Sequence, residues 1–266
     1  MALNRLLTYT LLLLSLHLSG QGLLIEQNGQ LIRFDTPTGT TDSLMMFEFD
    51  PVEHSRLAFL SDTSNMQLRW SNGTAYVVKW YDVSKRDSLV QATEARQPRF
   101  DFADGSVRFD GGQWMTSAGG YTFLNDFNDP RSIVMQILPD AYAASAAQNW
   151  FTFVSLSPIN YSAILYQRLS EVNFETFNYT AVDRIRGGVA HEPQKFNFIV
   201  NQTDIFIDGA GAGSAQTGPS INSPSQMSIG GISSGRWVSG NLYLLIVNDF
   251  ALNKGQRILT NKYLQK

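Results

Sequence analysis

The chain has 266 residues, a formal net charge of −3 and no cysteine, and 16% of its residues are charged while 12% are aromatic. The absence of cysteine excludes disulfide bonds, thiolate zinc sites and a cysteine nucleophile. Because no run of Lys or Arg occurs, the sequence lacks the charge distribution of a nucleic-acid-binding protein, and no nucleic-acid partner is expected. A chain of this length can bury one large core without cross-links.

Residues 1–22 form an apolar N-terminal segment, in which Arg5 precedes a run from Leu6 to Leu18. The run is too short to span a bilayer, and its form is typical of a secretory signal peptide. The alternative is a docking helix that is retained and buried against a partner. The first fate predicts an exported protein, and the second predicts a subunit embedded in an assembly.

Residues 23–69 are expected to add N-terminal strands to the main domain, starting with a hairpin. Its signal is the Asn28-Gly29 step between two apolar flanks. Further short strand-like runs recur along the chain, at 44–49, 67–70, 75–80, 107–109, 132–138, 150–156, 163–166, 196–200, 204–207 and 241–247. Short strands at this spacing predict an all-β sandwich or barrel.

Steps that contain glycine separate these strands and predict tight turns. They include 72–73, 104–105, 111–112, 187–188, 208–209 and 230–231. The stretch from Gly209 to Pro224 is expected to be the most flexible part of the domain. Trp70, Trp80 and Trp150 stand in strand patterns and are expected in the core.

One helix is expected, between Ala251 and Leu264 near the C-terminus. Asn253 is suited to cap its first turn, and Gln256 follows three residues later, which is the pattern of a capping box. Since no proline-rich linker interrupts the chain before it, the helix belongs to the same domain as the strands.

Three groups of segments carry a family resemblance. In chain order they are Val78–Ser84 (VKWYDVS) with Val107–Gly112 (VRFDGG), then Thr203–Gly209 (TDIFIDG), and finally Met227–Gly231 (MSIGG), Gly240–Ile246 (GNLYLLI) and Ala251–Asn253 (ALN). In this order and spacing they resemble the concanavalin A-like lectin/glucanase superfamily, in particular its laminin-G-like jelly-roll branch. The resemblance covers residues 70–266. It implies an all-β fold, a lectin-like antiparallel jelly-roll β-sandwich with one short C-terminal helix.

Related β-glucanases carry Glu-x-Asp-x-Glu on one strand, and the nearest match here runs from Glu171 to Glu175. The resemblance would make Glu171 the nucleophile and Glu175 the acid/base. However, Asn173 replaces the central Asp and removes the charge that tunes the pair. The sequence therefore predicts that the chain is not an enzyme, and that these acids lie on the solvated face of a strand.

A calcium ion is the one cofactor that the resemblance suggests, since lectin-like relatives often hold calcium between loops. The densest group of oxygen ligands is formed by Asp126, Asn128 and Asp129. The alternative is a turn rich in Asx residues ahead of a strand.

Sugar binding would need exposed aromatic rings beside polar donors, because a pyranose stacks its apolar face on a ring. Trp114 and Trp237 both stand in glycine-rich loop contexts and are the candidate ligand-binding residues. The alternative is that each fills the core or the rim of the sandwich.

These observations predict a non-catalytic, lectin-like surface module that binds glycan or a surface protein. Its expected location is extracellular, on the cell envelope or on a virion, for example as a phage decoration or receptor-contacting protein. If the N-terminal segment is retained, neighbouring subunits of an assembly are further partners. The alternatives are a glycoside hydrolase on the same fold and a purely structural assembly module.

Overall fold

The computed structural model describes residues 23–27, 30–34, 46–47, 49–117, 119, 121, 131–140, 148–155, 161–167, 173–177, 184–190, 194–201, 204–214, 225–231 and 237–266. The chain divides into two compact units, Met1–Phe49 and Asp50–Lys266. Residues 1–22 lie outside the described part, so both fates of this segment stay predictions. No helix in the described ranges is long and apolar enough to cross a membrane.

The first unit contains a small antiparallel sheet in the order β1 (Leu23–Gln27), β2 (Gln30–Phe34) and β3 (Met46–Phe47). Gln27 pairs with Gln30, so only two residues connect the first two strands. This register confirms the predicted hairpin, because a two-residue connection is what an Asn-Gly step favours.

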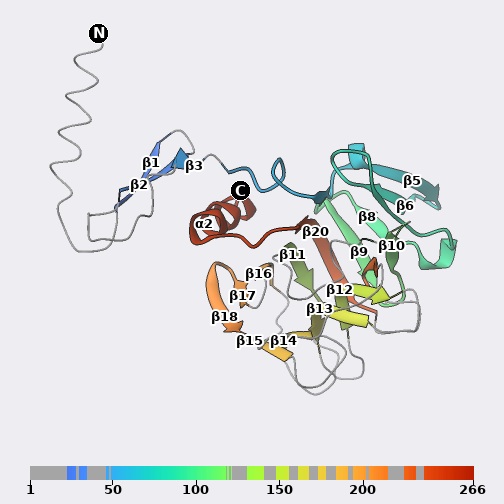
Figure 1. The fold of residues 1–266 in the computed structure, drawn as a ribbon. Helices are drawn as coiled ribbons and strands as arrows, with labels where there is room; N and C mark the ends of the chain where they lie inside the picture. The colour runs from blue at the N-terminus through green and yellow to red at the C-terminus, as the bar shows by residue number, and fades with distance from the viewer. Residues whose placement is uncertain are drawn as a thin grey trace, which may run out of the picture. The chain divides into compact units, whose positions relative to one another are not determined.

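The second unit is built almost entirely from strands (Figure 1). In chain order they are β4 (Leu57–Leu60), β5 (Met66–Ser71), β6 (Thr74–Tyr81), β7 (Ser88–Val90), β8 (Arg99–Asp101), β9 (Ser106–Asp110), β10 (Met115–Ser117), β11 (Ser132–Pro139), β12 (Gln148–Ser155), β13 (Tyr161–Gln167), β14 (Asn173–Phe177), β15 (Arg184–Ala190), β16 (Phe196–Asn201), β17 (Asp204–Ile207), β18 (Ala210–Ser214), β19 (Ser225–Ile229) and β20 (Ser239–Asn248). Short 3₁₀ turns cover Thr63–Asn65 and Glu94–Arg96, and helix α2 covers Lys254–Leu264.

All pairings between these strands are antiparallel, and they form two runs. One run is β8-β9-β20-β11-β16-β17-β18, with β4 beside β9 on the same edge of β20. The other is β5-β6-β7-β10-β19-β12-β13-β14-β15. A single pairing, Tyr76 with Arg99, joins the two runs at a corner between β6 and β8.

Side chains from both runs meet in one hydrophobic core. Alternation along β9 shows the principle, since Val107 and Phe109 are fully buried whereas Arg108 and Asp110 face outward. The first run contributes chiefly Val107, Phe109, Ile133, Met135, Ile137, Phe196, Phe198, Ile205, Leu242 and Leu245, and the second contributes Ala75, Val77, Trp80, Leu89, Met115, Met227 and Ile229. The second unit is therefore the predicted all-β antiparallel jelly-roll sandwich.

Helix α2 packs on the outer side of the first run. It begins with the predicted capping box, in which Asn253 and Gln256 exchange hydrogen bonds of 2.9 Å. Leu259 is buried, and the carbonyl oxygen of Leu264 accepts a 2.7 Å hydrogen bond from Gln136 on β11. Nearly every residue of β20 is buried, and this strand pairs with β11 along one edge and with β4 and β9 along the other.

Some local predictions are wrong. Gly187 and Gly188 lie inside β15 rather than in a turn, at the point where its register with β14 shifts, and glycine within a strand is typical of such an irregularity. The predicted flexible stretch begins with strand β18 instead, because Asp208 and Gly209 take positive φ and return the chain so that Ile207 pairs with Ala210. The remainder of that stretch lies outside the described residues.

Candidate functional site

Two exposed aromatic side chains stack on each other at the surface of the sandwich. The ring centroids of Trp70 and Phe102 are 5.6 Å apart and their planes differ by 17°. Trp70 is 62% exposed and Phe102 is 56% exposed. Trp80, by contrast, is fully buried as predicted. The prediction that Trp70 belongs to the core is therefore wrong.

Turn geometry places Trp70 at the surface. It is next to last in β5 and pairs with Ala75, just before the hairpin turn at Asn72 and Gly73. Both turn residues have positive φ, 49° and 77°, which is the backbone geometry of a type I′ turn. Ala75, its partner across the hairpin, is buried, whereas the indole of Trp70 beside the turn is exposed.

Phe102 follows β8 in the turn that leads to β9. This turn is held by Asp101, whose backbone oxygen accepts from Gly105 at 2.8 Å and whose side chain accepts from Ala103 at 3.0 Å. Beneath it, Phe100 belongs to the core and meets Phe102 edge-to-face with centroids 4.9 Å apart. The outer ring pair is thus continuous with the core, which limits its motion.

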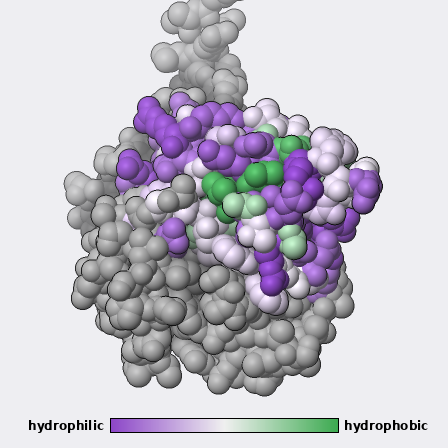
Figure 2. Space-filling view, turned by 90° about the vertical axis from the view of Figure 1, so that its right-hand side faces the viewer, coloured by the Kyte–Doolittle hydropathy of each residue, from purple (hydrophilic) through white to green (hydrophobic). Residues whose placement is uncertain are grey.

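Hydrophobic residues gather within a hydrophilic surrounding on the face of the molecule where β5 and β6 lie (Figures 1 and 2). A flat aromatic surface that is open to solvent and fixed from beneath is suited to stack against the apolar face of a sugar ring. Since one face of Trp70 lies on Phe102, the exposed area of its indole belongs mainly to the opposite face and the edge.

The two predicted ligand-binding residues lie in loops that meet at Arg96. The Arg96 guanidinium stands 4.7 Å from the ring centre of Trp237, and its Nη1 donates to the carbonyl oxygen of Gly112 at 3.0 Å. The backbone N–H of Trp114 donates to the carbonyl oxygen of Arg96 at 3.3 Å. Both tryptophans are half-buried. The structure therefore places Trp114 and Trp237 next to the same residue, Arg96. Their role in ligand binding stays a prediction.

A chain of hydrogen bonds ties this loop region to β5. Gln91 donates to the carbonyl oxygen of Trp114 at 2.7 Å, and Gln97 donates to the carbonyl oxygen of Gln91 at 3.0 Å. Arg69, the neighbour of Trp70 in the chain, donates to the Gln97 side chain at 3.0 Å. Because both glutamines are buried, these bonds are shielded from water and fix the loops firmly.

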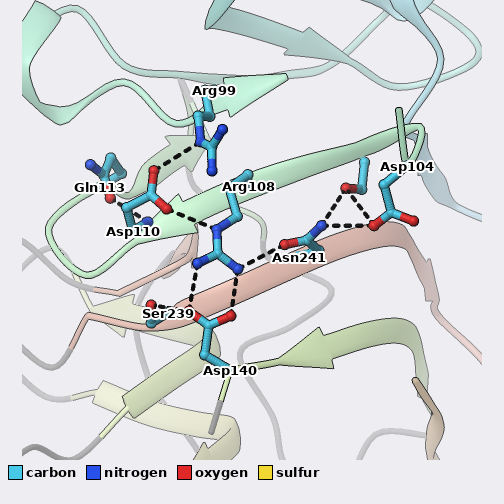
Figure 3. Close-up of polar contacts among 9 residues, drawn as sticks. Arg99, Asp104, Arg108, Asp110, Gln113, Asp140, Ser239 and Asn241 are labelled. Carbon is cyan, nitrogen blue, oxygen red and sulfur yellow. Dashed lines mark hydrogen bonds and ion pairs between the residues drawn. The ribbon is translucent and has the colours of Figure 1, made fainter. Parts of the chain in front are cut away.

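A separate cluster of polar side chains lies on the outer face of β9 and β20 and is centred on Arg108 (Figure 3). Its guanidinium donates to both carboxylate oxygens of Asp140, at 2.6 and 2.5 Å, and to Asp110 at 2.8 Å. It also donates to Asn241 at 3.0 Å. These bonds use four of the five N–H donors of the guanidinium, so Arg108 links β9, the end of β11 and β20.

Asp104 ends the same group. Its carboxylate accepts from the Tyr243 hydroxyl and, at 2.8 Å, from the Asn241 side chain. Burial by itself raises the pKa of Asp104, but the hydrogen bonds from Tyr243 and Asn241 outweigh it, so this pKa lies below the ordinary 3.8. Burial, followed by the bond to Asp104, raises the pKa of Tyr243. The pair therefore stays as a carboxylate and a neutral phenol around neutral pH.

The predicted calcium ligands Asp126, Asn128 and Asp129 lie outside the described residues, as does Glu171. Glu175 is placed by its backbone on β14, where it pairs with Tyr166 and Arg186. Within the described part of the chain, no group of three or more acidic or histidine side chains is arranged to hold a metal ion.

Sequence reasoning missed the aromatic pair, although one signal was available. Trp70 stands directly before the Ser71-Asn72-Gly73 turn, and a bulky ring at the tip of a hairpin has few core neighbours. Phe102 gave a similar signal, since it lies between Asp101 and the Asp104-Gly105 step. The stacking itself joins residues 32 positions apart and was not visible in the sequence.

Comparison with protein-family models finds no match, and comparison with curated proteins finds none either. Solved structures do share the fold. A Trypanosoma rangeli sialidase in complex with 2,3-difluorosialic acid matches with a TM-score of 0.58 at 13% identity, over 86% of this chain and 35% of the sialidase. The complex of that sialidase with 2,3-difluoro-KDN gives 0.59 at 14% identity, over 99% and 39%.

A single domain also matches. It is domain 4 of AbnA, a GH43 extracellular arabinanase from Geobacillus stearothermophilus, in complex with arabinotriose, with a TM-score of 0.53 at 10% identity over 76% of this chain and 96% of that domain. The chain spans well under half the length of the sialidases. At these identities the likeness shows the fold alone, which is a β-sandwich shared with carbohydrate-related proteins.

The comparison corrects one prediction. Asn173, in place of an acid, led to the prediction that the chain is not an enzyme. Solved structures that share its fold include sialidases and a domain of an arabinanase, so this prediction is wrong, because a fold found in such enzymes gives no ground for excluding activity.

Proposed function

We propose that the chain is a carbohydrate-binding β-sandwich domain that recognises glycan through the exposed face of Trp70 and Phe102. The stacking of these two rings is the observation that carries the proposal. An aromatic pair that is more than half exposed costs free energy in water. The structure holds it in place from below through Phe100, which is an arrangement suited to a flat ligand.

The shared fold supports this proposal. The arabinanase domain that matches over 96% of its length was solved with arabinotriose bound, so a domain of this architecture and size has been seen with a sugar. The stacked pair supplies an apolar surface, and Ser71, Asn72 and Thr74 on the same hairpin supply hydroxyl and amide groups for hydrogen bonds.

The proposed setting is outside the cell, on the cell envelope or on a virion. Its support is the apolar segment 1–22, whose form is that of an export signal or a docking helix. A protein partner on the same face is the alternative that the binding experiment has to separate.

A glycan array probed with the full chain tests the proposal. The unaltered protein should bind one or more glycans, and Trp70→Ala should lose that signal. Ile258→Ala is the matched control, because it removes another exposed apolar side chain, on helix α2, and should leave binding unchanged. If no glycan binds, or if both variants bind like the unaltered protein, the proposal is wrong.

Glycoside hydrolysis is a second candidate function, favoured by the sialidase and arabinanase structures that share the fold. Glu171 and Glu175 are the acids to test, because they stand in the strand pattern that resembles a glucanase. Release of reducing sugar from any glycan that binds, lost in both Glu171→Gln and Glu175→Gln, would establish this function.

A further inference from the structure

We infer that the glycan carries a carboxylate, and that Arg96 binds this carboxylate between the Trp114 and Trp237 loops. The inference rests on the proposed function, since it names the class of glycan, and it concerns a second contact apart from the Trp70 face. Arg96 lies where three parts of the chain meet, namely the 3₁₀ turn Glu94–Arg96, the loop of Gly112 and Trp237.

Arg96 is held in a fixed orientation by neutral groups. The indole of Trp237 lies 4.7 Å from the guanidinium carbon, and the carbonyl oxygen of Gly112 accepts from Nη1 at 3.0 Å. A β-carbon built on Gly112 would stand 3.5 Å from the same Nη1, so the guanidinium lies along the backbone of that loop. These contacts fix the plane of the group but leave its charge uncompensated.

Neighbouring arginines differ from Arg96 in this respect. Arg69 pairs with Glu94 at 3.6 Å, Arg99 pairs with Asp110 at 3.0 Å, and Arg108 pairs with Asp140. In the part of the chain that the structure describes, Arg96 has no carboxylate within 4.0 Å. Its Nε and Nη2 have no protein acceptor there, and neither nitrogen is among the fully buried atoms without a partner.

A carboxylate fits this position better than a neutral hydroxyl. The guanidinium is a planar fork whose two parallel N–H groups match the two oxygens of a carboxylate. The half-buried setting strengthens the attraction, because less water screens it than on an open surface.

Arg257 provides a matched control. Its guanidinium lies 4.4 Å from the ring of Phe206 and its Nη1 donates to the carbonyl oxygen of Leu252 at 2.8 Å, so it has the same kinds of contact as Arg96. It stands on helix α2, apart from the two tryptophan loops. Arg257→Gln removes one positive charge that has the same kinds of contact as Arg96, and it leaves the inferred site intact.

The experiment measures binding of uronic-acid and sialic-acid oligosaccharides, each paired with its own methyl ester, by titration calorimetry on the full chain. The acid forms should bind at least about tenfold more tightly than the esters, since a hydrogen bond to a charged group contributes a free energy of this size. Arg96→Gln should reduce the ratio to about one, and Arg257→Gln should preserve it. Added salt should weaken binding of the acids only.

Arg96→Lys is a second variant in case Arg96→Gln does not fold. It keeps the positive charge of the side chain but loses the planar guanidinium. Its ratio should fall between those of the unaltered protein and Arg96→Gln. Equal binding of acids and esters by the unaltered protein, or an undiminished ratio in Arg96→Gln, would overturn the inference. Neutral glycans that bind and depend on Trp70 would then still support the proposed function, whereas binding of no glycan at all would defeat both.

Discussion

The backbone of Gly230 lies directly against the ring of Phe109. A β-carbon built on Gly230 would stand 2.2 Å from two ring carbons of Phe109, and the residue has a φ of 76°. Phe109 is fully buried on β9, so its ring has no room to move aside. This contact joins the end of β19 to the core of the sandwich and requires glycine for two separate reasons.

Gly230→Ala should therefore be strongly destabilising, by about 3–5 kcal/mol, since overpacking adds to the cost of positive φ. Gly73→Ala is the comparison, because Gly73 has a φ of 77° but nothing within 4 Å of its would-be β-carbon. The free energy of unfolding of this variant should fall by only about 1–2 kcal/mol, which is the cost of placing alanine at a positive φ. Chemical denaturation measures both free energies of unfolding, and equal losses would contradict the packing argument.

The Asp104–Tyr243 hydrogen bond should make stability depend on acid. The pKa of Asp104 is lowered in the folded protein, so its carboxylate stabilises the fold above the ordinary pKa of 3.8, and this contribution is lost as pH falls through the lower folded pKa. Tyr243→Phe removes one donor and brings that pKa closer to 3.8.

Unfolding free energies measured from about pH 6 down to about pH 2 should fall less steeply in Tyr243→Phe than in the unaltered protein, over the acid range set by the carboxyl pKa. The variant should also be less stable at neutral pH, by about 1–2 kcal/mol for a lost bond to a charged group. Two parallel curves would show that this hydrogen bond does not set the pKa of Asp104.

The capping box of helix α2 predicts a smaller effect. Asn253→Ala removes the side-chain acceptor for the backbone N–H of Gln256 and should cost about 1 kcal/mol. Asn253→Ser keeps an acceptor at the same place and should cost much less. Thermal denaturation distinguishes the two, and identical melting temperatures for both variants would mean that the cap contributes nothing.

The sequence predicted the fold well where local chemistry decides the structure. Strand runs such as 132–138 and 241–247 are confirmed, because a short apolar run that contains β-branched residues is a local signal of a buried strand. Asn253 and Gln256 marked the start of the helix for the same reason. Short strands such as β7, β8 and β10 escaped prediction, since three residues give too short a pattern and their strand character comes from their partners.

The candidate site was less predictable, because it depends on contacts between distant segments. Trp114 and Trp237 could be singled out by their loop context, but not their common neighbour Arg96, which stands in a separate turn. Trp70 fitted a strand pattern and gave no sign that its partner would be Phe102 in another turn. The domain motifs began at residue 70, whereas the division between compact units falls at Phe49.

Oxidative footprinting of the tryptophans, read by mass spectrometry, tests the central claim most directly. In the free protein, Trp70 should oxidise readily because it is 62% exposed, whereas the fully buried Trp80 should be protected. Adding the glycan that binds best on the array should protect Trp70 and leave Trp80 unchanged. If Trp70 oxidises at the same rate with the glycan bound, the aromatic face is not the binding site and the account is contradicted.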